Sequence, residues 1–166
     1  MSIISTNVPY NSSVLERNLK NLLQVYPFLK SSIIGYSVLG KPLYVITIGN
    51  GLKEVFYSGS FHANEWITSP VLMKFIDEAS SAYVYDSNLL GFSARELLNN
   101  VTIHLCPMVN PDGVDLVTGF LSNNSSGYRI AEKIASSYAT IPFPDGWKAN
   151  INGVDLKNYQ PVCKVL

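Results

Sequence analysis

A short apolar run over residues 54–61 passes directly into a longer amphipathic run over residues 67–82. The first run is typical of a buried strand, because it is short and bounded by turn-forming residues. The second predicts a helix, since its apolar side chains recur at helical spacing; they are Leu72, Phe75, Ile76 and Ala79. A buried strand that leads straight into an amphipathic helix is the basic unit of an α/β fold.

The flanking sequence predicts more elements of the same kinds. Ser12, Ser13 and Glu16 resemble a capping box, and leucines at helical spacing follow them. The predicted helices cover residues 13–25, 66–83 and 93–99, and the predicted strands cover residues 31–38, 42–49, 55–60 and 101–108. Strands 31–38 and 42–49 form a hairpin through Leu39, Gly40 and Lys41. One hairpin among alternating strands and helices predicts an α/β sandwich, with a mixed sheet flanked by helices.

The pattern is less regular after residue 108. Asn110, Pro111, Asp112 and Gly113 have the chemistry of a turn, because proline presets φ and glycine accepts positive φ. The sequence predicts a loop over residues 121–128, one or two helical turns over 129–137, and irregular structure over 142–146.

The strand and the helix meet at His62-Ala-Asn-Glu65-Trp66. A histidine at the strand end and a glutamate in the first helical turn can point two ligands at one metal ion. Zinc takes imidazole nitrogen and carboxylate oxygen, and catalytic zinc sites commonly use two histidines, one carboxylate and a water. The alternative is a half-buried histidine whose ring nitrogens bond to the backbone.

The chain has one other histidine, His104, which lies between Ile103 and Leu105 in a predicted strand. It is therefore expected to be a satisfied, half-buried side chain and not a ligand. Cys106 is expected to be a buried small hydrophobe, and no signal supports a disulfide with Cys163. The carboxylates that could act as a base, Glu78, Glu96 and Glu132, are expected to be solvated.

Three stretches together resemble the successive landmarks of the zinc carboxypeptidase superfamily. They are His62–Thr68, Pro107–Gly113 and Gly153–Leu156. Asn64, between the two candidate ligands, and the run Gly146-Trp-Lys-Ala-Asn150 are most similar to the bacterial branch that cleaves γ-D-glutamyl–diamino acid bonds in cell-wall peptides.

The resemblance implies a fold in which an eight-stranded mixed sheet is flanked by helices, with residues 1–166 forming one C-terminally truncated part of the catalytic domain. It implies zinc ligation by His62 and Glu65, and a substrate contact by Asn110. Lys148 is a further candidate for a substrate contact, as a cation that polarises a carbonyl or binds a carboxylate. Lys148 has an alternative interpretation as an exposed loop lysine.

The family's third zinc ligand, a histidine, and its catalytic base, a glutamate, lie downstream of the Gly-Val-Asp landmark. No histidine follows His104 in this sequence, and Lys157 stands where the family usually has asparagine. No catalytic residue is therefore assigned. The expected function is a zinc peptidase that is inactive or impaired as this truncated chain; the alternative is a non-catalytic remnant or half-domain that needs a partner chain.

The composition of the chain limits the kinds of partner and the cellular location that are expected. Formal net charge is zero and no block of lysine or arginine stands out, which argues against a nucleic-acid partner. No apolar run is long enough to span a membrane, and Met1–Asn7 has no secretory signal, so a cytoplasmic location is expected. The expected substrate is a peptide of cell-wall muropeptide type. A sheet cut between strands would leave an exposed edge, through which a homo-oligomer could form.

Overall fold

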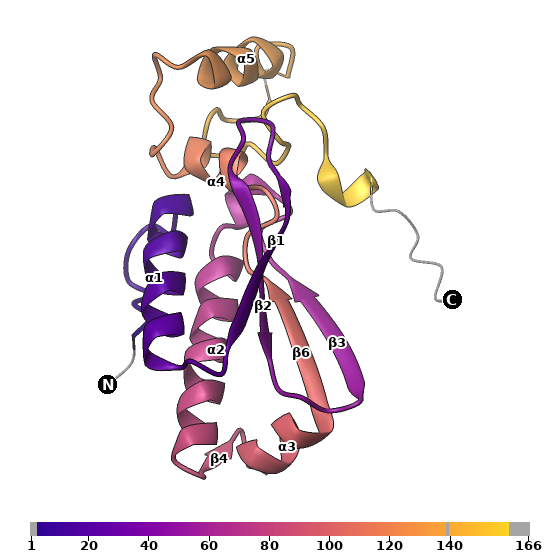
Figure 1. Ribbon diagram of the computed structural model, residues 1–166. Coiled ribbons are helices and arrows are strands. Elements are labelled where there is room, and N and C mark those ends of the chain that lie inside the picture. The colour runs from indigo at the N-terminus through magenta and orange to yellow at the C-terminus, as the bar shows by residue number, and fades with distance from the viewer. Residues whose placement is uncertain (1–2, 139, 160–166) are drawn as a thin grey trace.

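The computed structural model describes residues 3–138 and 140–159 (Figure 1). Its helices are α1 (Ser12–Val25), η1 (Ala63–Glu65), α2 (Thr68–Val84), α3 (Ala94–Asn100), α4 (Pro111–Val117), α5 (Ser126–Ala135) and η2 (Leu156–Tyr159), where η marks a 3₁₀ helix. Its strands are β1 (Lys30–Tyr36), β2 (Pro42–Ile48), β3 (Lys53–Ser58), β4 (Asn88–Leu89), β5 (Phe92–Ser93) and β6 (Val101–Cys106).

Four strands form one mixed sheet in the order β1-β2-β6-β3. The β1–β2 and β2–β6 pairs are antiparallel, whereas β3 runs parallel to β6 with Phe56 opposite His104. Strands β4 and β5, which the sequence did not predict, form a separate two-stranded sheet. The predicted α/β architecture with a mixed sheet is confirmed.

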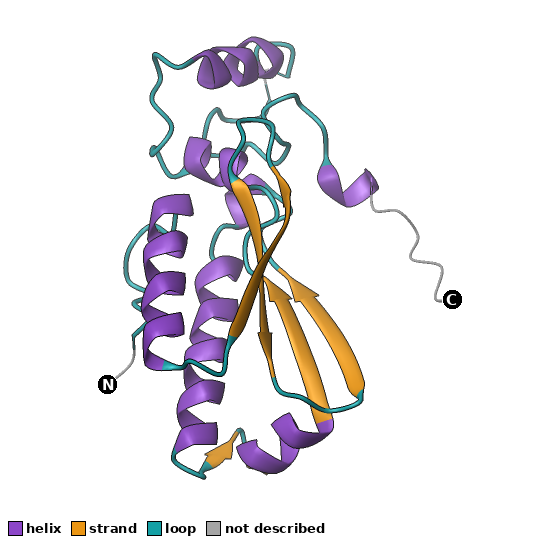
Figure 2. Ribbon diagram, in the orientation of Figure 1, coloured by secondary structure: helices purple, strands orange, loops and turns teal. Residues whose placement is uncertain are grey.

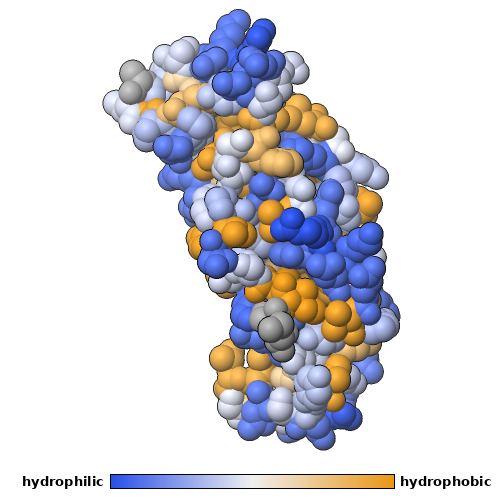
Figure 3. All heavy atoms as spheres, turned by 90° about the vertical axis from the view of Figure 1, so that its left-hand side faces the viewer, coloured by the Kyte–Doolittle hydropathy of each residue, from blue (hydrophilic) through white to orange (hydrophobic). Residues whose placement is uncertain are grey.

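The main core lies between the sheet and the two long helices. Leu22 of α1 and Ile76 of α2 are fully buried in one cluster with Ile46 of β2 and Leu105 of β6. Figure 2 shows α1 and α2 on the same side of the sheet. On the outer surface of this side, shown in Figure 3, hydrophilic and hydrophobic residues are interspersed. The opposite face of β3 carries no described helix.

Two predictions about individual elements are wrong. Residues 110–113 do not form an isolated turn: Asn110 is the N-cap of α4, its side chain accepts from the Gly113 amide, and Pro111 occupies the first turn. Asparagine at the N-cap and proline at N1 are also the standard start of a helix, and here a helix follows. The N-cap of α1 is Asn11 and not a serine, because the Asn11 side chain accepts from the Val14 amide. The Ser12 hydroxyl instead donates to Asp115.

Other boundaries shift. Glu65 lies in the 3₁₀ helix η1, and α2 begins three residues later, so the predicted single helix is two elements. Helix α5 starts inside the predicted loop 121–128. Strand β3 is largely exposed, although its apolar sequence predicted burial. Cys163 lies outside the described residues. Within residues 3–138 and 140–159, no helix is long and apolar enough to span a membrane.

Candidate metal centre

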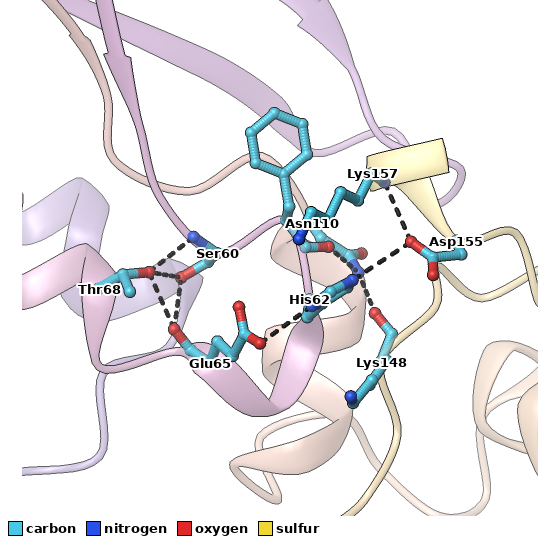
Figure 4. Close-up of polar contacts among 9 residues, drawn as sticks. Ser60, His62, Glu65, Thr68, Asn110, Lys148, Asp155 and Lys157 are labelled. Carbon is cyan, nitrogen blue, oxygen red and sulfur yellow. Dashed lines mark hydrogen bonds and ion pairs between the residues drawn. The ribbon is translucent and has the colours of Figure 1, made fainter. Parts of the chain in front are cut away.

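His62 and Glu65 lie together just beyond the carboxyl end of β3 (Figure 4). The His62 Nδ1 atom is 3.0 Å from Glu65 Oε1. The imidazole is 12% exposed and the carboxylate 54% exposed, so the pair faces solvent from a partly sheltered position. The predicted convergence of these two side chains is observed.

Ser60 shapes the turn that presents the pair. Its backbone has a φ of 51°, in the left-handed region that a non-glycine residue seldom adopts. The strain is offset by hydrogen bonds: the Thr68 hydroxyl accepts from the Ser60 amide at 2.7 Å, and the Ser60 hydroxyl lies 2.7 Å from that of Ser69. Thr68 in turn donates to the Glu65 carbonyl at 2.9 Å. The start of α2 therefore fixes the path of the chain on both sides of His62.

Asp155 contacts the other side of the imidazole. Its Oδ1 atom is 3.2 Å from His62 Nε2, across 93 residues of sequence. If Nε2 donates its proton to Asp155, Nδ1 presents a lone pair toward Glu65; this tautomer is an assignment from the partners. A carboxylate that holds the second nitrogen of a ligand histidine is a common device of metal sites. Asp155 belongs to the stretch Gly153–Leu156, in which its sequence context indicates no role. The tertiary contact with His62 reveals one.

The donor atoms fit zinc in part. Two ligands at about 2.0–2.1 Å from a tetrahedral zinc ion lie about 3.3 Å apart, close to the 3.0 Å between Nδ1 and Oε1. Among the described residues, however, no group of three or more His, Cys, Asp or Glu side chains could hold a metal ion. His62 and Glu65 therefore bring two candidate ligands together, with the Asp155 carboxylate on the other side of the imidazole.

The Asn110 side chain links the segment before His62 to the segment around Ala149. Its side chain is 2% exposed, and its amide nitrogen donates to the carbonyls of Ala149 at 3.0 Å and Phe61 at 3.3 Å. The carbonyl oxygen is used by the cap of α4. Contact with a substrate stays a prediction for Asn110. In the structure its amide positions the backbone next to His62 and joins it to the 148–149 segment.

Close packing brings α4 against η1. A Cβ atom at Gly113 would come within 2.8 Å of the Ala63 Cβ, so a glycine is needed for this approach. Lys41 pairs with Asp115, and Asp115 also accepts from the Ser12 amide at 2.8 Å. The buried Asp115 carboxylate therefore links α4 to α1 and to the β1–β2 hairpin, and stabilises the position of α4 next to the metal centre.

Lys148 is adjacent to the metal centre through its backbone. Its carbonyl accepts from the Ala63 amide at 3.0 Å, while its side chain is exposed. It lines a cavity of about 620 Å³ together with Asn64, Trp147 and Asp155. Figure 4 shows Lys148, His62 and Asp155 in one neighbourhood. A lysine at the rim of such a cavity can attract a carboxylate or an oxyanion, and its substrate contact stays a prediction.

Neither His104 nor Cys106, which both lie in β6, joins the pair of His62 and Glu65 in a described hydrogen bond or ion pair. His104 lies mid-strand in β6 and its Nδ1 is 2.9 Å from the Thr47 hydroxyl, as expected for a satisfied histidine. Burial raises the pKa of the Cys106 thiol to about 11. Metals and electrophiles react with the thiolate, so the protonated Cys106 thiol is a poor nucleophile and a poor metal ligand at neutral pH.

Comparison with known proteins identifies the family. The zinc carboxypeptidase family matches residues 15–159. The chain belongs to the zinc carboxypeptidase family. It is 44% identical over 153 residues to γ-D-glutamyl-L-diamino acid endopeptidase 1 of Lysinibacillus sphaericus, covering 92% of this chain and 38% of that protein. It is 40% identical to the uncharacterized protein YqgT of Bacillus subtilis, with 92% and 40% covered.

Two solved structures have a similar fold. Bovine thrombin-activatable fibrinolysis inhibitor, in complex with tick carboxypeptidase inhibitor, has a TM-score of 0.60 at 18% identity, covering 87% of this chain and 38% of that one. A metallo-carboxypeptidase from Burkholderia cenocepacia has a TM-score of 0.56 at 20% identity, covering 91% and 38%. The chain thus spans about two fifths of the length of these proteins.

Proposed function

We propose that this chain provides part of the zinc centre of a peptidase that hydrolyses γ-D-glutamyl–diamino acid bonds in cell-wall peptides. One observation carries the proposal: His62 Nδ1 and Glu65 Oε1 converge at the carboxyl end of β3 while Asp155 holds His62 Nε2. The substrate class is supported by the activity for which the 44%-identical relative from Lysinibacillus sphaericus is named.

The chain's own residues have distinct parts in this proposal. His62 and Glu65 hold the metal, and Asp155 keeps the imidazole in the tautomer that leaves Nδ1 unprotonated. When zinc is bound, the chemistry it supplies is polarisation of the scissile carbonyl and a lower pKa for bound water. The Lys148 side chain, at the rim of the adjoining cavity, attracts the negative groups of a muropeptide.

The second candidate function is a non-catalytic half-domain that acts with another polypeptide. It is favoured by the count of ligands, since the described residues place only two metal-ligating side chains together. Catalytic zinc sites normally use three protein ligands. General-base catalysis, for which no described residue is assigned, typically contributes about 10²–10⁴-fold. We therefore expect the 166-residue chain, assayed alone, to have little or no peptidase activity.

Zinc content and turnover distinguish the two candidates. The purified chain is loaded with zinc, its metal content is measured, and it is assayed on a γ-D-glutamyl-diaminopimelate peptide and on a peptide with a hydrophobic C-terminus. We expect His62→Ala to lose the bound zinc while the matched variant His104→Gln retains it, with turnover below about 1 s⁻¹.

Faster turnover would overturn the expectation of inactivity if chelator and Glu65→Ala both abolished it, and would favour the first candidate for this chain alone. Equal zinc content in the His62→Ala variant and the unmodified chain would contradict the assignment of His62 as a ligand, whichever candidate holds.

A further inference from the structure

Two buried side-chain atoms of opposite hydrogen-bonding character belong to the lining of the 620 Å³ cavity next to the metal centre. Trp147 Nε1 is a donor and Asn64 Oδ1 is an acceptor, and both residues line this cavity. Neither atom has a hydrogen-bond partner among the described residues, so the two do not bond to each other. A buried polar group without a partner costs about 1–3 kcal/mol, and a ligand that bonds to both atoms would remove this cost. We call this space the Trp147 cavity.

The segments that carry the donor and the acceptor are fixed against each other. The Asn64 amide donates to the Trp147 carbonyl at 3.1 Å, and the Ala63 amide donates to the Lys148 carbonyl at 3.0 Å. The Trp147 ring also packs perpendicular to Phe143, with ring centroids 5.8 Å apart. The backbone around both atoms is therefore in place before a ligand arrives, which lowers the entropic cost of binding.

The rest of the lining favours a neutral group with an alkyl substituent. One lysine and one aspartate, Lys148 and Asp155, line the cavity, so its lining has no net charge. Apolar surface is supplied by Ile134, Ile141 and Pro142. The hydroxyl groups of a sugar would lie against these alkyl groups without partners, at a cost in free energy. An amide with an aliphatic neighbour matches the lining better.

We propose that the Trp147 cavity binds one residue of a peptide through its main chain. Trp147 Nε1 donates to the carbonyl oxygen of that residue, and Asn64 Oδ1 accepts from its amide N–H. A single residue can meet both atoms, because the N–H and C=O of one residue in an extended chain point to the same side, as they do across paired antiparallel strands. An aliphatic side chain on this residue packs against Ile134 and Ile141. The inference deepens the proposed function and rests on it for the choice of a peptide as the ligand.

The test follows the indole N–H signals of the isotope-labelled chain by nuclear magnetic resonance. The sequence has two tryptophans, and Trp66 packs against the main core, so its signal is an internal reference. Trp147→Phe assigns the other signal. The probe is N-acetyl-L-alanine N′-methylamide, which presents one complete peptide residue between neutral ends. The matched probe is O-acetyl-L-lactic acid N-methylamide, in which an ester oxygen replaces the N–H that meets Asn64.

The titration is done with chelator present and involves no hydrolysis. A failure of zinc binding or of turnover, which would count against the proposed function, is therefore distinguishable from a failure of this inference.

We expect the amide probe to shift the Trp147 signal with a millimolar dissociation constant and to leave the Trp66 signal in place. The ester probe should bind at least about fivefold more weakly, since it leaves the Asn64 acceptor unpaired. Asn64→Leu should bind the amide probe at least about fivefold more weakly than the unmodified chain and should bind the two probes equally. The matched control is Asn123→Leu, the same substitution at an exposed loop position, with affinity within about twofold of the unmodified chain.

Three results would overturn the inference. The first is a Trp147 signal that does not move up to about 50 mM amide probe, which excludes even millimolar binding. The second is equal affinity of the unmodified chain for the amide and ester probes, together with unchanged affinity in an Asn64→Leu variant that keeps the helical circular dichroism of the unmodified chain. The third is tighter binding of N-acetylglucosamine than of the amide probe, which would make the acetamido group of a sugar the occupant.

Discussion

Strands β3 and β6 are parallel neighbours of equal length, and both lead into the metal centre. β6 ends just before Asn110 and β3 just before His62, yet Ile103 and Leu105 of β6 are buried while Val55, Phe56 and Tyr57 of β3 are exposed. Their sequences are similarly apolar. The difference shows that neighbouring elements decide burial: β6 has a strand on each side and helices over one face, whereas β3 pairs with one strand among residues 3–138 and 140–159.

The strongest way to test this contrast is to remove the same side chain from each region. Leu105→Ala empties a fully buried position in β6 and should lower the free energy of unfolding by about 2–5 kcal/mol. Leu52→Ala, at a fully exposed position just before β3, should change it by less than about 0.5 kcal/mol. Urea titration followed by circular dichroism measures both. Equal costs would contradict the assignment of the core to β6.

Asn110 tests how firmly β6 supports the metal centre. Asn110→Ala removes the cap of α4 and leaves partly buried carbonyls, including that of Ala149, without their donor. We expect a loss of about 1–3 kcal/mol in the free energy of unfolding. Asn11→Ala removes only the N-cap of α1, a loss of about 1 kcal/mol, and should leave zinc binding unchanged. If Asn110→Ala bound zinc as well as Asn11→Ala and the unmodified chain do, Asn110 would have no role in positioning the metal centre.

On the β3 side, the site depends on contacts from far along the chain. Asp155→Asn keeps the shape of the side chain but loses the charge that faces His62 Nε2. We expect zinc affinity to fall by about 10–100-fold, measured by competition with a fluorescent chelator. Asp145→Asn, an exposed neutralisation in the preceding loop, is the matched control. Similar losses in both variants would indicate a general effect of charge and not orientation of the imidazole.

The smallest expected effect is on β6 itself. His104→Gln should leave zinc affinity unchanged, because His104 lies mid-strand and bonds Thr47. If zinc affinity fell as much as in His62→Ala, His104 would be a ligand, and the metal centre would depend on a side chain in the middle of β6 as well as on those that follow β3.

Local sequence patterns predicted where the helices and strands lie, but predicted less well how far each one is buried. The leucines of α1, the hairpin of β1 and β2, and the apolar run of β6 were all found from spacing and turn chemistry. The exposure of β3 was not, because it depends on which strands lie beside it. Asn110 was correctly placed at the strand end beside His62, but the hydrogen bonds of its buried amide could not be foreseen. These bonds join segments about 40 residues apart.

For the site, the pair of His62 and Glu65 was predictable from their spacing at a strand end. Asp155 was not assigned, since a lone aspartate in a Gly-Val-Asp run gives no sign of which histidine it meets. Lys148 was a candidate because of its positive charge, and the cavity that it lines with Trp147 and Asp155 could be seen only in three dimensions.

The long sequence separation between His62 and Asp155 has a consequence for synthesis. At about 5–20 residues per second, a ribosome needs roughly 5–19 s to extend the chain by the 93 residues between them. The strands that flank His62, β2, β3 and β6, are complete by residue 106, well before the aspartate is made. The nascent protein thus passes through a period in which the strands that lead to His62 are complete, but neither the Lys148 carbonyl that accepts from the Ala63 amide nor the Asp155 carboxylate is yet in place. The contact that holds His62 Nε2 is therefore among the last of the described contacts of this site to form.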